Sequence, residues 1–275
     1  MIAAVLDNLS RLTTFILDLD GCIYSGNQLY PSAQELISFL QEEQKGLYFL
    51  TNNSTDRSGK IREKLLRMGL PAEEVPILVA TELVGSYLAE RYGRIRVHSI
   101  GSEDLEQSLR MAGHQVIPLE SQEPCDFLVL GRDTSFTYQT LQACTRRLEK
   151  GVRLVTTNPD LYHPGEDGSR VPETGALIAA IQAVSGVIDV QSVGKPFTYP
   201  FDKVLQNTGA IPGNCVMVGD NPYTDILGGR SAGMFTVWIS HGHSFPDHLG
   251  FVPDLTVDSV KELLETLQER KALNR

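Results

Sequence analysis

The chain of 275 residues has 41% hydrophobic and 21% charged residues, an ordinary globular composition with enough length for one large domain or two smaller ones. Acidic residues outnumber basic ones by 34 to 24, and the formal charge of −10 argues against a general affinity for nucleic acid or anionic membranes. An anionic substrate would therefore need a local positive site.

The distribution of cysteines and apolar segments bears on the compartment. The four cysteines are scattered without a Cys-x-x-Cys pair or neighbouring histidines, so the sequence indicates neither a disulfide framework nor a zinc site. The apolar N-terminus lacks a basic segment, and no apolar run approaches the length of a membrane span. We therefore expect a cytoplasmic protein without a membrane partner.

Short apolar runs alternate with amphipathic segments in the first part of the chain. The pattern predicts, in order, a strand at 15–19, a helix at 31–44, a strand at 47–50 and a helix around 61–68. This alternation is typical of the α/β class and predicts a doubly wound, Rossmann-like parallel sheet. Such sheets bind ligands at the carboxyl ends of their strands.

The middle of the chain keeps this rhythm but loses the carboxylates at the strand ends. It predicts helices at 81–92, 102–112 and 138–150, and strands at 95–100, 127–130 and 152–156. We interpret residues 80–183 as an inserted α/β cap domain, because the acidic strand ends return only after it. The catalytic core domain would then comprise residues 1–79 and 184–275.

The last part of the chain returns to short apolar strands that are followed by polar residues. The pattern predicts helices at 175–184, 201–208 and 259–269, and strands at 190–193, 215–218, 235–239 and 255–257. Lys195 follows the first of these strands, and Asp220 and Asp225 follow the second. These residues are candidates for the same sheet edge as the polar residues of the N-terminal part.

The first strand ends in two carboxylates, Asp18 and Asp20, two positions apart. Side chains with this spacing share one face of a strand, so the two carboxylates should project toward one spot. Neighbouring carboxylates need a cation, a shared proton or different proton affinities to coexist. The alternative is that Asp-x-Asp-Gly only ends the strand in a turn, since both residue types favour turns.

The other strand ends favour the chemical interpretation. Asp18, Asp20 and Asp220 would form a site of hard oxygen ligands that suits Mg²⁺. Thr51, Asn52 and Lys195 suit a phosphoryl group, helped by the amides of the helix that starts after Thr51. Each of these segments alone is also typical of a helix cap, a turn or a solvated loop, but the ordered set favours a joint site.

Phosphoryl transfer gives the two first carboxylates different roles. A carboxylate is anionic at neutral pH, so an aspartate attacks phosphorus without a base and forms an aspartyl phosphate. Asp20 would then give a proton to the departing alkoxide and later take one from the hydrolytic water. Asp18 is the candidate nucleophile.

Four segments resemble the motifs of the haloacid dehalogenase superfamily of phosphatases. They are Asp18-Leu19-Asp20-Gly21, Leu50-Thr51-Asn52-Asn53-Ser54, Gly194-Lys195-Pro196 and Gly219-Asp220-Asn221-Pro222-Tyr223-Thr224-Asp225. The Thr-Asn-Asn-Ser form and the large insert are similar to the NagD-like, nitrophenylphosphatase branch with a large α/β cap. The resemblance covers essentially the whole chain.

The resemblance implies a magnesium-dependent phosphatase that hydrolyses a small phosphomonoester, such as a sugar phosphate or nucleotide, through an aspartyl phosphate. It implies Asp18 as nucleophile and Asp20 as acid and base. It also implies that Asp18, the Asp20 carbonyl and Asp220 bind Mg²⁺, with Asp225 supporting the ion from behind its ligands. Thr51 and Lys195 would hold the phosphoryl group.

The cap contributes further candidates. The segment from Thr157 to Pro164 resembles the substrate loop of the family's cap, so Asn158, Asp160 and His163 are candidate substrate contacts, although each is also a common turn residue. Two positions depart from the family pattern. Cys22 replaces a common Thr or Val, and Glu173 replaces a common glycine and adds a negative charge near the cap loop.

Two other functions compete with hydrolysis. A receiver-like signalling module also accepts a phosphoryl group on clustered aspartates, but it needs neither the acid Asp20 nor a cap. A nucleotide-binding oxidoreductase would require a Gly-x-Gly-x-x-Gly fingerprint after the first strand, which the sequence lacks. The expected partner is a small phosphorylated metabolite, and the sequence does not identify which one. A homodimer is compatible with the sequence, but the sequence does not decide the oligomeric state.

Overall fold

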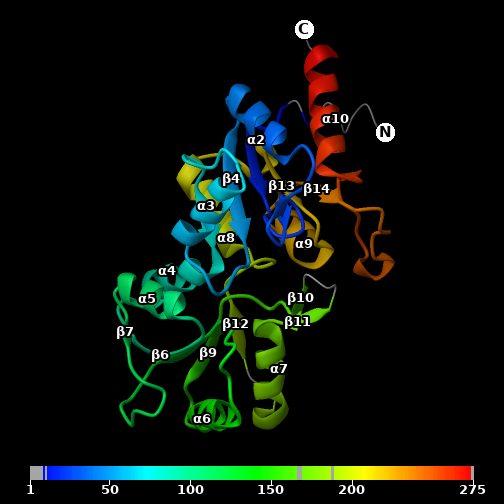
Figure 1. Cartoon of the computed structure of the whole chain (residues 1–275). Coiled ribbons are helices and arrows are strands. Elements are labelled where there is room, and N and C mark those ends of the chain that lie inside the picture. The colour runs from blue at the N-terminus through cyan, green and yellow to red at the C-terminus, as the bar shows by residue number, and fades with distance from the viewer. Residues whose placement is uncertain (1–8, 10, 166–168, 187–188, 274–275) are drawn as a thin grey trace. The chain divides into compact units, whose positions relative to one another are not determined.

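The computed structural model describes residue 9 and residues 11–165, 169–186 and 189–273 (Figure 1). The chain folds into two compact units. The first comprises Met1–Thr51, Arg62–Ile77 and Pro196–Arg275, and the second comprises Asn52–Ile61 and Leu78–Lys195. Each unit is built on its own sheet and is described by itself.

The first unit is built on a six-stranded sheet with the order β15-β14-β13-β1-β4-β5. Its strands are β1 (Thr14–Leu17), β4 (Gly46–Thr51), β5 (Ile77–Val79), β13 (Cys215–Gly219), β14 (Phe235–Ile239) and β15 (Leu255–Val257). The central strand β1 is buried along its whole length and pairs in parallel with both β4 and β13. From β1 the chain builds the sheet outward through β4 and β5, and β13 begins the opposite side. The strand order therefore reverses between β1 and β13, the place where doubly wound sheets open a ligand crevice.

Helices and a small hairpin complete this unit. They are α2 (Ala33–Glu42), part of α3 (Ser58–Arg67), α8 (Tyr199–Thr208), α9 (Leu227–Ser231), α10 (Val260–Leu273), the short turns η1 (Pro212–Asn214), η2 (Pro222–Ile226) and η3 (Asp247–Leu249), and the hairpin β2 (Tyr24–Ser25) with β3 (Gln28–Leu29). The apolar residues of α2 recur at helical spacing, which buries Leu36, Ile37 and Leu40. The hairpin follows directly after Asp20 and was not predicted from the sequence.

The second unit contains a five-stranded parallel sheet with the order β12-β9-β8-β6-β7. The strands are β6 (Arg96–Ile100), β7 (Gln115–Val116), β8 (Phe127–Leu130), β9 (Arg153–Thr156) and β12 (Val190–Ser192). The helices are α4 (Ala80–Tyr92), α5 (Glu103–Met111), α6 (Tyr138–Glu149) and α7 (Thr174–Ser185). They pack as two pairs, α4 with α5 and α6 with α7. A hairpin of β10 (Tyr162–Pro164) and β11 (Arg170–Pro172) lies between β9 and α7.

Both sheets confirm the predicted α/β class. The division into units differs from the predicted domains: residues 52–61, 78–79 and 184–195 were assigned to the core but fall in the second unit. Strand β12 pairs with β9, so residues up to Lys195 pack with the second unit. The functional extents of core and cap stay predictions. None of the described helices combines the length and the hydropathy needed to cross a membrane.

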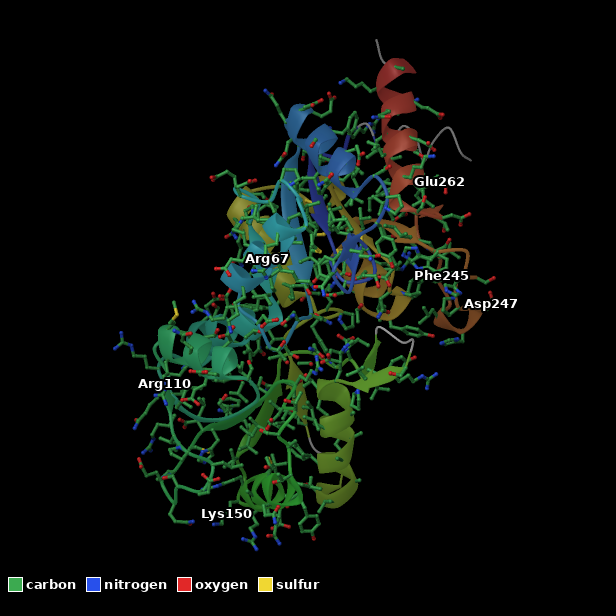
Figure 2. The ribbon with its side chains drawn as sticks, viewed as in Figure 1. Arg67, Arg110, Lys150, Phe245, Asp247 and Glu262 are labelled. Atoms are coloured by element: carbon green, nitrogen blue, oxygen red, sulfur yellow. The ribbon has the colours of Figure 1, made fainter. Side chains whose placement is uncertain are left out.

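Charged side chains on the outer helices pair locally with each other. Arg67 on α3 and Arg110 on α5 each lie near a glutamate four residues earlier, at 3.9 Å and 2.6 Å (Figure 2). Exposed pairs of this kind contribute little to stability.

Candidate active site

Three carboxylates converge where the strand order of the first sheet reverses. Asp18 follows β1, and Asp220 and Asp225 follow β13. The Asp18 amide donates to the Val218 carbonyl at 2.9 Å, which fixes the two strand ends side by side. Ligand oxygens of the three aspartates lie within 4.8 Å of one another, with Asp18 and Asp225 buried. Carboxylates this close repel unless a cation or a proton intervenes, so the cluster could hold a metal ion.

Two glycines allow the carboxylates to approach the backbone. Gly21 has a φ of +84°, and a Cβ there would overlap the Asp220 carboxylate. A Cβ on Gly219 would overlap the side chain of Asp225. The Asn221 amide donates to Asp225 Oδ2 at 3.0 Å and so fixes this carboxylate within its own loop. The glycines of both motifs are therefore a steric requirement of the cluster.

Asp20 stands two residues after Asp18, and its side chain is exposed. The Tyr24 hydroxyl donates to Asp20 Oδ2 at 2.8 Å. The Tyr24 ring is only 2% exposed, and the Lys64 ammonium lies 4.0 Å from its centroid. Tyr24 therefore gives Asp20 a fixed partner. Sequence reasoning missed it, although its position four residues after Asp20 placed it in the same turn.

Two aromatic residues contact the turn that follows Asp20. The Tyr30 ring stacks on His241 at 4.8 Å, and His241 Nε2 donates to the Gly21 carbonyl at 2.7 Å. Burial raises the pKa of Tyr30, the Ser25 hydrogen bond lowers it, and the Asp220 carboxylate raises it further. Cys22, one of the two departures from the family pattern, is fully buried and has a structural role.

Thr51 is the predicted phosphate ligand of the first unit. It ends β4, the parallel neighbour of β1, and its side chain is buried. The carboxyl ends of parallel neighbours lie at the same edge of a sheet, so Thr51 belongs to the edge that carries Asp18. Its position agrees with the prediction, while its binding of phosphate stays a prediction.

The second unit brings four other predicted residues together. Asn52 Oδ1 accepts from the Lys195 amide at 2.8 Å, and its Nδ2 donates to the Lys195 carbonyl and to Asp160 Oδ2, both at 2.9 Å. Asn158 Nδ2 donates to the Asn52 carbonyl at 2.7 Å. These residues belong to three separate segments of the sequence. We call this set, Asn52, Asn158, Asp160 and Lys195, the amide clamp.

The other departure, Glu173, also lies in the second unit. Its Oε1 accepts from His163 Nδ1 at 2.7 Å and lies 3.5 Å from Arg132 Nη1. Ser54 Oγ donates to its Oε2 at 3.4 Å. The additional negative charge is therefore matched by Arg132, which sequence reasoning missed although it follows the predicted strand at 127–130. His163 therefore contacts Glu173 and does not belong to the amide clamp.

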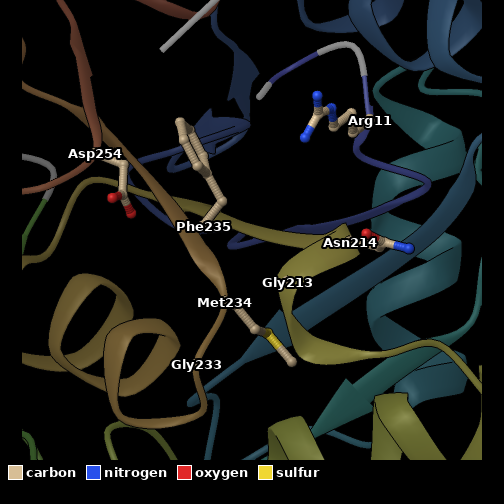
Figure 3. A pocket seen from close by; sticks show the side chains of 7 residues that line it. All are labelled: Arg11, Gly213, Asn214, Gly233, Met234, Phe235 and Asp254. Atoms are coloured by element: carbon tan, nitrogen blue, oxygen red, sulfur yellow. The ribbon is translucent and has the colours of Figure 1, made fainter. Parts of the chain in front are cut away.

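A cavity of about 320 Å³ opens at the opposite edge of the first sheet (Figure 3). Its lining includes Arg11 before β1, Asn214 before β13 and Met234 before β14. This is the amino-terminal edge, whereas doubly wound sheets place their chemistry at the carboxyl ends. No predicted site residue lines the cavity, so we do not assign it to the active site.

Comparisons with known proteins agree with this geometry. Residues 15–115 match the model of the haloacid dehalogenase-like hydrolases, and residues 192–263 match a HAD-hydrolase-like model. Chronophin from Mus musculus is 32% identical over 97% of each chain. The chain belongs to the haloacid dehalogenase-like hydrolases.

Other members of this family are also similar over most of their length. The acid sugar phosphatase of Staphylococcus epidermidis is 30% identical over 84% of this chain and 87% of its own. The crystal structure of a 4-nitrophenylphosphatase from Thermotoga maritima is 32% identical, covers 95% of this chain and 99% of its own, and has a TM-score of 0.86. The resemblance to the NagD-like, nitrophenylphosphatase branch is thereby confirmed, as is the prediction of a hydrolytic enzyme.

Proposed function

We propose that this hydrolase is a magnesium-dependent phosphatase that cleaves a small phosphomonoester through an aspartyl phosphate on Asp18. The observation that carries the proposal is the convergence of Asp18, Asp220 and Asp225, whose oxygens lie within 4.8 Å at the crevice of the first sheet. The names of three relatives, acid sugar phosphatase, chronophin and 4-nitrophenylphosphatase, support the reaction class.

The donor set fits the proposed ion. Mg²⁺ prefers negatively charged oxygen ligands. It needs only a few of them from the protein, because it keeps several of its water ligands. The carboxylates of Asp18 and Asp220 and the Asp20 carbonyl would bind it, and Asp225 would support it through its fixed carboxylate. When bound, the ion offsets the negative charge of the phosphoryl oxygens.

The side chains of the first unit divide the reaction between them. The Asp18 carboxylate attacks phosphorus while the bond from phosphorus to the leaving oxygen breaks, and Asp20 gives that oxygen its proton. Asp20 then removes a proton from water, whose oxygen attacks phosphorus and releases phosphate and a free Asp18. The hydrogen bond from Tyr24 keeps Asp20 oriented in both steps.

Lys195 and Thr51 would hold the oxygens of the phosphoryl group during transfer. Asn158, Asp160 and His163 would contribute to the choice of leaving group as residues of the cap. The substrate is a small phosphorylated metabolite, and the net charge of −10 argues against nucleic acid as a partner. A cytoplasmic location and a homodimer remain part of the same proposal. No feature of the described residues favours the receiver-like alternative.

The decisive experiment removes the nucleophile. Asp18→Asn should lower the hydrolysis of p-nitrophenyl phosphate by at least about a thousandfold and abolish the acyl phosphate that acid quenching traps on the wild-type peptide. Asp202→Asn, an exposed change on α8, is the matched control and should keep full activity. Circular dichroism should show the same fold for all three proteins. Turnover by a folded Asp18→Asn variant would refute the mechanism.

A further inference from the structure

We infer that Asn52 is a positioning residue for Lys195: its side-chain amide fixes the Lys195 backbone and ties it to Asp160 of the cap loop, without touching the phosphoryl group. The sequence instead predicted Asn52 as a phosphate ligand. The inference rests on the proposed function, which assigns Lys195 to the phosphoryl group. It concerns contacts within the second unit only.

The hydrogen-bonding capacity of the Asn52 amide decides between the two roles. An asparagine side chain offers two N–H donors and one carbonyl oxygen. Nδ2 donates one hydrogen to the Lys195 carbonyl and the other to Asp160, both at 2.9 Å. The orientation of the amide is fixed, because the Lys195 amide needs an acceptor and both other partners accept. No side-chain donor is left for the oxygens of a phosphoryl group.

The backbone before Lys195 packs directly against Asn52. A Cβ on Gly194 would lie 2.5 Å from Asn52 Oδ1 and 2.6 Å from the Thr157 carbonyl, so only glycine fits before Lys195. The Gly194 amide donates to the same Thr157 carbonyl at 2.7 Å, which continues the pairing of β12 with β9. Lys195 therefore leaves the sheet in one fixed direction.

The cap loop closes the clamp from its other side. Asn158 Oδ1 accepts from the Asp160 amide at 3.0 Å, while its Nδ2 donates to the Asn52 carbonyl. The Gly175 amide, at the start of α7, donates to the Asp160 carbonyl at 2.7 Å. The carboxylate that receives the second Asn52 hydrogen is thus itself held by the loop predicted to contact substrate. The position of Lys195 and the conformation of this loop are coupled through one amide.

The clamp also stands where the chain passes between its two units. Asn52 is the first residue of the second unit and Lys195 is the last. The Lys195 side chain is only 2% exposed, and a buried ammonium group loses hydration that fixed partners must replace. A shift of its backbone would therefore displace the charge from those partners. The Asn52 amide would therefore determine the position of the Lys195 ammonium group by fixing the Lys195 backbone.

A double-mutant cycle tests this inference. Asn52→Ala, Lys195→Ala and the double variant are compared with wild type for inhibition by inorganic phosphate and for kcat/KM with p-nitrophenyl phosphate. We expect about a tenfold loss of phosphate affinity for Asn52→Ala and about a hundredfold loss for Lys195→Ala. The double variant should fall within about twofold of Lys195→Ala, because the amide then has no ammonium left to position.

The design separates the possible failures. Lys195→Ala keeps the backbone groups that Asn52 binds. Any loss of activity or phosphate affinity that Asn52→Ala causes in the Lys195→Ala background therefore measures structural damage that does not involve the ammonium group. Multiplicative losses in the double variant would show that Asn52 acts independently of Lys195 and would overturn the inference. Unchanged phosphate inhibition in Lys195→Ala would instead refute the role of Lys195 in the proposed function.

A second variant guards against misfolding of Asn52→Ala. Asn52→Ser is neutral and keeps a side-chain oxygen near the Lys195 amide, but it cannot donate to both the Lys195 carbonyl and Asp160. We expect the same lack of additivity with Lys195→Ala for phosphate inhibition. Additive losses with this variant would contradict the inference in the same way.

Discussion

Both sheets reverse their strand order once, and they differ in the residues that stand at the reversal. In the first sheet the reversal lies between β1 and β13, and Asp18 and Asp220 follow those strands. In the second sheet it lies between β6 and β8, and Gly101 and Gly131 follow them. A Cβ on Gly101 would lie 2.7 Å from the Leu105 side chain, and a Cβ on Gly131 would lie 3.0 Å from it. The buried Leu105 side chain thus packs against the strand ends of the second sheet, at the point where the first sheet carries carboxylates.

This difference shows that topology offers a crevice and residue type decides its use. Carboxylates at such a point need a cation, whereas glycines let a helix pack closely over the strand ends. The second unit instead carries polar groups in the segments after β9 and β12, which supply Asn158, Asp160 and Lys195 of the amide clamp, and at Glu173 just before α7. Changes at the carboxylates of the first sheet should therefore have the largest effects, and changes within the second sheet the smallest.

Removal of the divalent ion should give the largest effect. Chelation should lower p-nitrophenyl phosphate hydrolysis by at least about a thousandfold, because the carboxylates then repel the phosphoryl group, and added Mg²⁺ should restore it. The ion should also raise Tm, since it binds only the folded cluster. Asp220→Asn should lose this Tm shift, whereas Asp247→Asn, an exposed change, should keep it. A chelator-insensitive enzyme would contradict the site.

Tyr24→Phe should have the next largest effect and should depend on the leaving group. Without the hydroxyl, Asp20 loses the partner that orients it at 2.8 Å. An alkyl leaving group needs the proton from Asp20, but p-nitrophenolate departs without it. We expect kcat/KM to fall about tenfold for glycerol phosphate and by less than about twofold for p-nitrophenyl phosphate. Equal losses on both substrates would indicate a merely structural tyrosine.

Glu173→Gln should produce a smaller change that is confined to substrate choice. The substitution removes the charge that holds Arg132 and the strong acceptor for His163 Nδ1. Across a panel of sugar phosphates, nucleotides, phosphoglycolate and pyridoxal phosphate, we expect KM changes of about three- to tenfold with little change in kcat. Inhibition by inorganic phosphate should stay the same. A uniform loss of kcat would argue against a role in specificity.

The smallest effect concerns stability within the packed sheet. His98 on β6 is buried, and its Nδ1 donates to the Ile117 carbonyl at 3.0 Å. Burial lowers the pKa of His98 in the folded protein. Below about pH 6.5, His98 is therefore protonated in the unfolded chain while it is still neutral in the folded chain. Stability should therefore fall as pH decreases, by at most about 1.4 kcal/mol per pH unit from this residue. Urea unfolding of His98→Gln should show a shallower pH dependence than wild type, and equal slopes would disprove the assignment.

Local patterns in the sequence were sufficient for the longer helices and strands and for the acidic residues at the strand ends. The strand at 215–218 and its following carboxylate were predictable because burial of a parallel strand leaves a continuous apolar run that ends abruptly in polar residues. The hairpins β2–β3 and β10–β11 and the short strand β7 were not predicted. Strands of two or three residues are too short to show a period, and only their pairing defines them.

The sequence by itself determined the α/β class, the family and the strand ends that carry Asp18, Thr51, Lys195 and Asp220. The partners of these residues were decided by the tertiary structure alone. Asn52 and Lys195 are 143 positions apart, and Glu173 stands 119 positions from Ser54. Periodicity reports only which face a residue occupies among its chain neighbours. Which amide reaches which carbonyl depends on strand order and register, and these are fixed only when the sheets assemble.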